Sequence, residues 1–415
     1  MLQIIHGKVM TMTGVIYEDG LVEIENGKIT GITEYRSEHL SSPDSKKKNN
    51  TDNNAGNSKK NDNIVINAEG CWVMPGLIEA HCHMGITEEK KGIEGDDCNE
   101  SVHPITPMLR AIDAINPMDA AFDDAVRAGI TSAMIGPGSA NVVGGQFAFV
   151  KTKGRSMDDL IVLAPAAMKV AFGENPKVNY SGMGQSPATR MAIAGMLRRE
   201  LWEAKQYQSQ KKKAAKNKEN FTESFHWESW LPVLEHRIPL KAHVHRADDI
   251  FTAIRIAKEF DLDMTLDHCS EGHLIAEEIA ESGFPAILGP DFASRNKIEV
   301  QNMAFKTAGI LHQAGVKTAI TTDHPVSIIQ SLPLCAGMAV KAVLPMEEGL
   351  KSITIYPAQI CRVDDRVGSL GVGKDGDIAI FDGNPMELFT HNLCTVINGQ
   401  IQYKADDFSA RVCYN

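Results

Sequence analysis

The sequence lacks long apolar runs and an excess of positive charge. No segment approaches the roughly 20 consecutive apolar residues of a membrane-spanning helix, and the 415 residues carry a net charge of -11. Because nucleic acids and anionic membranes attract basic surfaces, neither is expected as a partner. Residues 1–7 also lack the basic stretch and following apolar stretch of a signal peptide, so we expect a cytoplasmic protein.

Cysteine pairs and nucleotide-binding motifs are missing as well. The eight cysteines are scattered and form no C-x-x-C pair, which suits a reducing compartment better than a disulfide framework. No glycine-rich phosphate loop or dinucleotide fingerprint is present, and this disfavours enzymes with nucleotide cofactors. The length of the chain is sufficient for one large domain and a smaller one.

Both ends of the chain show the pattern of short strands. Residues 1–35 alternate apolar and polar side chains, and Asn26-Gly27 is typical of a tight hairpin turn. Short apolar runs separated by glycine turns return near the C-terminus. We therefore expect residues 1–72 and 355–415 to pair into one small β-sandwich domain.

Two polar stretches interrupt these patterns. Residues 41–63 contain almost no apolar side chains and cannot offset the entropy of ordering, so a disordered insertion is expected there. The lysine-rich stretch from 208 to 223 is interpreted as a solvated extension of the preceding helix rather than as a binding surface.

Residues 73–354 alternate short apolar runs with amphipathic helical patterns, which indicates βα units and a parallel sheet. Candidate strands are Gly76–Ala80, Thr131–Ile135, Ile161–Val170, Leu240–Val244, Met264–Leu266, Ala286–Leu288 and Lys317–Thr321. With about seven or eight such units, the best fit is an α/β fold containing a TIM-like (β/α)8 barrel.

The segment 75–83 (PGLIEAHCH) ends an apolar run with two histidines at alternate positions. In an extended strand residues i and i+2 point to the same face, so His81 and His83 can offer both imidazoles to one metal ion. A single His-x-His pair is weak evidence, because such pairs arise often by chance.

Later segments support this interpretation. His243 and His245, then His268, then Asp323, each follow or end a short apolar run. Together with the first pair they describe a divalent-metal site assembled from four separate strand ends. A structural zinc site is less consistent with this spacing, because structural zinc prefers local clusters of cysteine and histidine.

The motifs PGLIEAHCH (75–83), TTDHP (321–325) and LGVGKDGDIAIFDGNP (370–385) resemble those of the amidohydrolase superfamily. Residues 141–146 and 172–177 are similar to its imidazolonepropionase-related branch. One departure is Glu79, where the family usually carries aspartate. The resemblance covers nearly the whole chain apart from the two polar stretches.

The resemblance implies that His81 and His83 bind one metal ion and that histidines of the fifth and sixth strands bind a second. At the fifth strand His243 and His245 compete, and His243 is preferred because it lies deeper in the apolar run. His268 is the histidine of the sixth strand, and Asp323 is expected to bind metal and to transfer protons.

A two-metal centre of this kind needs a bridging group. Lys169 lies in an otherwise apolar segment, and an unpaired buried ammonium is costly. Carboxylation of Lys169 and an ion pair with Glu174 are both open, and Glu174 is itself the second bridging candidate. We expect one or two divalent ions, with zinc as the first choice and iron or manganese as alternatives.

The predicted activity is hydrolysis of a C-N bond in a small molecule by a metal-activated water. Asp323 and His268 are the expected catalytic residues, and Gln146, His245 and His273 are candidates for substrate binding. Gln146 is expected in or next to a loop, where the flexible Gly144-Gly145 pair lets the chain approach a ligand closely. Opening of an imidazolone ring, deacetylation, deamination and dipeptide cleavage are all consistent with the sequence. A non-catalytic scaffold is the rival, but scaffolds of this fold typically lose metal-binding histidines. A homo-oligomer is expected by analogy.

Overall fold

The computed structural model describes residues 1–36, 63–89 and 92–414. Apart from residue 63, the insertion predicted at 41–63 lies outside these ranges. No helix in the described part is both long and apolar enough to cross a bilayer.

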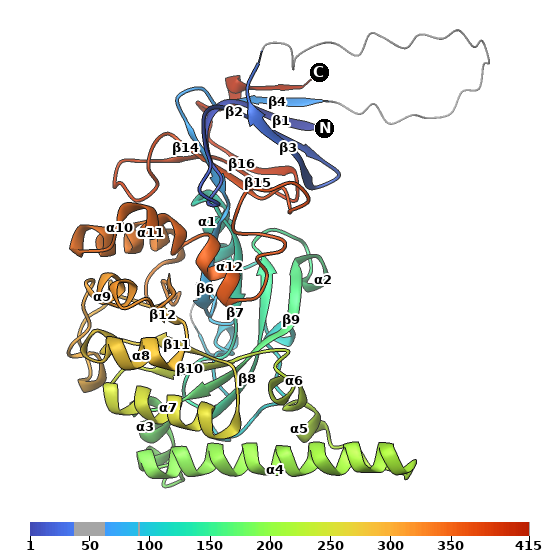
Figure 1. The fold of residues 1–415 in the computed structure, drawn as a ribbon, viewed down its shortest axis with the longest axis vertical. Coiled ribbons are helices and arrows are strands. Elements are labelled where there is room, and N and C mark those ends of the chain that lie inside the picture. Colours follow the sequence, from blue (N-terminus) through green and yellow to red (C-terminus); the bar gives the residue numbers. More distant parts are fainter. Residues whose placement is uncertain (37–62, 90–91, 415) are drawn as a thin grey trace.

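The two ends of the chain form a single sheet, drawn at the top of Figure 1. Its strands are β1 (Leu2–Met10), β2 (Ile16–Glu25), β3 (Lys28–Glu34), β4 (Ile64–Asn67), β5 (Trp72–Pro75), β14 (Ile378–Phe381), β15 (Asn392–Ile397), β16 (Gln400–Lys404) and β17 (Val412–Tyr414). The sheet branches at β1, because Leu2 to Ile5 pair with β4 whereas Lys8 and Val9 pair with β5. The expected association of the two ends is therefore confirmed, as one branched sheet around a shared core.

The central part forms a nearly closed barrel of eight strands, as expected. In spatial and sequence order these are β6 (Leu77–Cys82), β7 (Ile130–Ile135), β8 (Val143–Lys151), β9 (Ile161–Ala171), β10 (Leu240–Val244), β11 (Met264–His268), β12 (Ala286–Leu288) and β13 (Thr318–Ile320). β8 was not predicted as a strand, and it runs antiparallel to both β7 and β9. Its Gly144-Gly145 pair favoured a ligand loop, but every residue of β8 is buried.

Helices cover one side of the barrel, where Figure 1 shows α7 to α11 stacked beside the strands. The helices are α1 (Ala120–Arg127), α2 (Met157–Leu160), α3 (Glu174–Gly182), α4 (Arg190–Asn217), α5 (Phe225–Glu228), α6 (Leu231–Leu234), α7 (Ala247–Phe260), α8 (Ala276–Ser282), α9 (Thr307–Gln313), α10 (Leu332–Ala342), α11 (Met346–Lys351) and α12 (Ile355–Ile360). α4 starts at a Thr189 cap that accepts the Ala192 N–H, and it continues into the lysine-rich stretch as far as Asn217.

A buried ion cluster joins the barrel to the terminal sheet. Lys151 at the end of β8 is 2% exposed, and its Nζ lies 2.8 Å from Asp375 and 2.5 Å from Asp377. Both aspartates precede β14, and Asp375 also contacts Lys28 and Arg366. The cluster thus attaches a barrel strand to the segment that enters the sheet.

Replacing Lys151 with methionine is expected to lower the free energy of unfolding by about 3–5 kcal/mol, because two buried carboxylates would lose a shared cation. Chemical denaturation measures this loss. The matched control is Lys153→Met, because Lys153 pairs with Asp123 at the surface and such pairs contribute under about 1 kcal/mol. Equal losses in the two variants would contradict a linking role for Lys151.

Candidate metal centre

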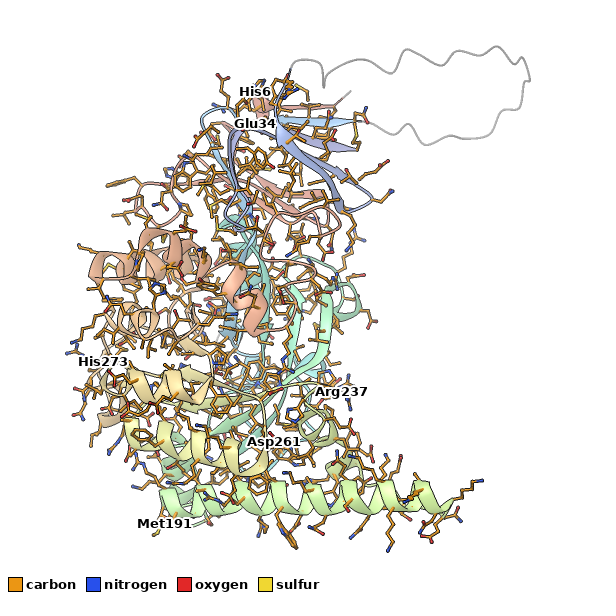
Figure 2. All side chains as sticks on the ribbon, in the orientation of Figure 1. His6, Glu34, Met191, Arg237, Asp261 and His273 are labelled. Carbon is orange, nitrogen blue, oxygen red and sulfur yellow. The ribbon has the colours of Figure 1, made fainter. Side chains whose placement is uncertain are left out.

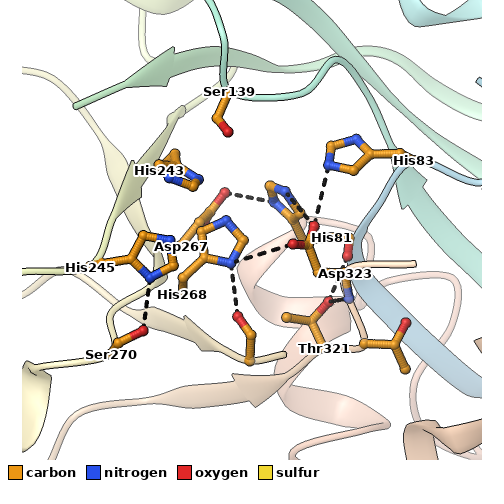
Figure 3. A network of polar contacts seen from close by, with 12 residues as sticks. His81, His83, Ser139, His243, His245, Asp267, His268, Ser270, Thr321 and Asp323 are labelled. Atoms are coloured by element: carbon orange, nitrogen blue, oxygen red, sulfur yellow. Dashed lines mark hydrogen bonds and ion pairs between the residues drawn. The ribbon is translucent and has the colours of Figure 1, made fainter. Parts of the chain in front are cut away.

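Five histidines and one aspartate meet at the C-terminal ends of the barrel strands (Figure 3). His81 lies in β6 and His83 directly follows it. His243 lies in β10 and His245 directly follows it. His268 ends β11, and Asp323 follows β13. All six side chains are buried. Their potential ligand atoms form two groups within 4.8 Å, one of His81, His268 and Asp323, the other of His243, His245 and His268.

Asp323 is the centre of the first group. Its Oδ1 lies 3.2 Å from Nε2 of His83 and 3.6 Å from Nε2 of His81, yet it has no hydrogen-bond partner among the described residues. Nδ1 of His83 lies 2.7 Å from the Gly136 carbonyl, so this nitrogen carries the proton and donates it. Nε2 of His83 then faces a carboxylate oxygen, and the pair needs a cation between its two atoms, either a proton or a metal ion. The donor set therefore fits a divalent metal.

Asp267 lies behind His81, where the sequence did not reveal a role for it. Its Oδ2 is 2.8 Å from Nδ1 of His81 and 3.2 Å from Nζ of the buried Lys241. A carboxylate beside a ligand histidine fixes the ring orientation and raises its basicity. Asp267 and Lys241 are therefore placed to aim Nε2 of His81 at the centre.

The second group contains both histidines that competed for the fifth strand. The His243 and His245 ring centroids lie 4.6 Å apart, and the His243 and His268 centroids lie 4.5 Å apart. Nδ1 of His245 lies 2.8 Å from Ser270 Oγ, and Nδ1 of His268 lies 2.8 Å from the Gly289 carbonyl. The Nε2 atoms of His245 and His268 are thus left for a ligand. Both His243 and His245 belong to this group of potential metal ligands.

Burial keeps most of these imidazoles neutral. It lowers the pKa of His81, His243 and His268 well below the ordinary value, and that of His245 to about 4. Neutral imidazole is the form that binds metal. For His83 burial is outweighed by Cys98 and Asp323, which raise its pKa to about 10. The negative charge that favours a proton at His83 also favours a metal cation.

Lys169 on β9 lies at the edge of the first group. It is fully buried, and its Nζ is 3.2 Å from Nε2 of His81. Burial lowers its pKa to about 8, although Asp267 and Asp323 act in the opposite direction. The described residues contain no ion pair between Lys169 and Glu174. Glu174 begins α3, and its backbone N–H donates to Glu299.

Two of the residues predicted to bind substrate have hydrogen-bond partners outside the His/Asp cluster. Nε2 of Gln146 donates to the Pro107 carbonyl at 3.1 Å, so this amide holds a neighbouring loop. Nδ1 of His273 lies 3.0 Å from Thr307 Oγ1 on α9, and Figure 2 labels His273 at the outer edge of the helical side. A role of Gln146 and His273 in substrate binding stays a prediction.

Glu79 connects the first barrel strand, β6, to the segment that follows the last barrel strand, β13. Its carboxylate accepts from the Thr322 N–H at 2.9 Å and the Thr322 hydroxyl at 2.7 Å, and Thr321 also donates to it. Burial raises its pKa to about 7 against the effect of these hydrogen bonds. Both oxygens are therefore occupied in holding β6 beside the segment that carries Asp323.

The backbone is also unusual at the cluster. His268, Cys269 and Asp323 have φ values of 70°, 48° and 52°. Non-glycine residues adopt this left-handed conformation at an energetic cost and often do so at functional sites. Tertiary contacts thus hold two of the ligand candidates in orientations that local preference alone would not select.

A cavity of about 620 Å³ opens onto both groups. It is lined by His83, His243, His245 and Asp323, by the polar residues Asn99, Ser139, Asn175, Ser270, Ser294, Asn296 and Lys297, and by the apolar residues Phe292, Val300, Met303 and Val326. This volume is typical of a pocket for a small molecule.

The barrel and the buried His/Asp cluster define a TIM-like α/β protein with a metal-binding site. The model of the Amidohydrolase family matches residues 72–410, and the chain therefore belongs to this family. The resemblance inferred from the sequence motifs is confirmed.

Individual relatives agree with this assignment. A crystal structure of an amidohydrolase from Thermotoga maritima MSB8 is 34% identical and matches with a TM-score of 0.89, covering 98% of this chain and 100% of that one. The amidohydrolase tasK of Hapsidospora irregularis is 27% identical over 82% of this chain and 37% of that protein. An imidazolonepropionase of Cupriavidus taiwanensis is 30% identical over 37% of this chain and 36% of that one. The chain thus spans little more than a third of the curated relatives it matches.

Proposed function

We propose that this protein hydrolyses a C-N bond of a small molecule with the help of one or two divalent metal ions. The observation that carries the proposal is the unpartnered, buried Asp323 Oδ1, which faces Nε2 of both His81 and His83. His81, His83 and Asp323 would hold one ion, and His243, His245 and His268 would hold a second. Zinc is the first candidate because imidazole and carboxylate are its ordinary ligands, and iron or manganese are alternatives.

When bound, the metal would supply Lewis-acid activation of water and of the substrate carbonyl or amidine carbon. Asp323 then serves as the proton carrier. Burial raises its pKa, but His268 and His83 outweigh this effect and hold the pKa below the ordinary value. Asp323 is therefore ionised near neutral pH and can accept a proton from water and deliver it to the leaving nitrogen.

Lys169 is proposed as the bridging group of a two-metal centre. Its lowered pKa makes the neutral amine accessible near pH 8, and a neutral amine can react with carbon dioxide to form an anionic carbamate. The carbamate oxygens would extend from a residue that already contacts His81. Glu174 stays the second bridging candidate.

The substrate class within this chemistry is open among cyclic amides and amidines, N-acyl compounds, dipeptides and amines that undergo deamination. A small-molecule partner is supported by the cavity volume of about 620 Å³. The non-catalytic scaffold is less consistent with the cluster, because the five histidines predicted to bind or surround the metal and Asp323 are buried together.

The test is elemental analysis of protein purified without chelators, followed by a hydrolysis screen with N-acyl amino acids, dipeptides and imidazolone-type rings. We expect at least one metal equivalent per chain and turnover of one substrate class. Turnover should disappear after chelation and return when metal is added. A chain that retains no metal and hydrolyses none of these compounds would support the scaffold instead.

A further inference from the structure

A buried carboxylate that the sequence did not single out faces the second histidine group. Glu299 lies in the short helical segment Ile298–Val300 between β12 and α9 and is 1% exposed. Its Oε1 is 3.9 Å from Nε2 of His243 and 3.8 Å from Nε2 of His245. Oε1 of Glu299 therefore lies near Nε2 of both histidines, although it comes from a distant part of the chain.

These separations are too long for hydrogen bonds. They are close to the spacing between two ligand atoms of one metal ion, because bonds of about 2.0–2.2 Å in a tetrahedral site place the donors roughly 3.5 Å apart. The Nδ1 atom of His245 is already paired with Ser270, so Nε2 is the nitrogen left to bind. In the structure Nζ of Lys297 contacts Oε1 of Glu299, and the Asn175 amide lies 3.5 Å from Nε2 of His243, so an ion bound at these atoms would replace both contacts.

The position of the carboxylate is well supported by its surroundings. Oε2 accepts the Glu174 N–H at 2.9 Å, and Nζ of Lys297 lies 2.7 Å from Oε1. Lys297 also donates to Oδ1 of Asn175, whose amide donates to Ser139. A side chain at Gly173 would come within 2.9 Å of Oε2, so the glycine leaves the space that Glu299 occupies.

We propose that Glu299 is a ligand of a second divalent ion held by His243, His245 and His268. Three neutral imidazoles contribute no negative charge to a divalent ion, and Glu299 supplies one negative charge and a fourth donor. Lys297 keeps Asn175 as a partner while Glu299 binds the ion. This inference rests on the proposed function, since it assumes a metal centre at the barrel rim.

The test compares zinc binding by the wild-type chain and Glu299→Gln, using elemental analysis after dialysis and titration in competition with a chromophoric chelator. We expect two equivalents in the wild type. In Glu299→Gln the tighter equivalent should be retained and the other should bind at least about 10-fold more weakly. Cobalt substitution gives an independent readout, because loss of a carboxylate ligand changes the ligand-field absorption of only one of the two ions.

Glu271→Gln is the matched control. Glu271 is also a buried glutamate whose carboxylate accepts a backbone N–H, that of Ala247, but it lies outside both histidine groups. Its variant should bind zinc as the wild type does. If Glu299→Gln does not fold, the double variant Lys297→Met/Glu299→Gln removes the lysine that would be left unpaired, and the same weakening is expected.

The outcomes separate this inference from the proposed function. If the wild type and Glu299→Gln each bind two equivalents of zinc with the same affinities, the role of Glu299 is overturned and the proposed function is not affected. A single equivalent in the wild type would also overturn that role and would leave a one-metal hydrolase in place. A wild type that binds no metal would overturn the proposed function itself.

Discussion

Asp323→Asn is expected to lower kcat by about 10²- to 10⁴-fold, the usual contribution of a general acid–base group, while the protein stays folded. The amide cannot accept a proton from water, and it contributes no negative charge beside His83 and His81. The measurement is steady-state hydrolysis of the substrate class found in the screen. Circular dichroism and metal content, determined on the same samples, separate loss of chemistry from loss of the ion.

The control for this variant is Asp249→Asn. Asp249 is also a buried aspartate, but it pairs with Arg190 on the outer helices and contributes to neither ligand group. We expect it to reduce stability and to leave kcat close to the wild-type value. Near-normal kcat in Asp323→Asn would rule out Asp323 as the proton carrier.

Lys169→Ala is expected to weaken the binding of at least one metal equivalent by about 10- to 100-fold or more and to remove most of the activity. The reason is the position of Nζ 3.2 Å from His81 Nε2, in a fully buried setting where an anionic carbamate would be compensated by metal. Formate or acetate added to the variant should restore part of the activity, because a small carboxylate can occupy the space vacated by the side chain.

Lys151→Ala is the matched control for this variant, because Lys151 is also a buried lysine of a barrel strand. Its ammonium pairs with Asp375 and Asp377 rather than with the ligand groups, so its loss should affect stability more than metal content. Retention of full metal content and activity in Lys169→Ala would show that Lys169 does not bridge ions.

Much of the architecture follows from periodicity in the sequence. Alternating apolar runs and amphipathic segments predict βα units, and seven of the eight barrel strands match runs that the pattern identified. The exception is β8, whose paired glycines suggested a loop. Strand direction depends on how the connecting segments cross the barrel, and the local pattern of β8 contains no information on this.

The spacing of the histidines carries similar information about the candidate site. His81 and His83, like His243 and His245, are two residues apart and therefore share a face of their strands. Each pair also lies at the end of an apolar run, and such runs end at the same rim of a parallel barrel. The structure places these four side chains, His268 and Asp323 at that rim.

By itself the sequence determined the barrel, the terminal sheet and the strand ends where metal-binding side chains gather, because periods of two and 3.6 residues decide which faces are buried. Only the tertiary structure decided which groups stand beside those ligands. Asp267 reaches His81, and Glu299 approaches His243 and His245 from a loop more than 50 residues further along the chain. Contacts across such separations depend on strand order and loop path, which local patterns along the chain do not specify.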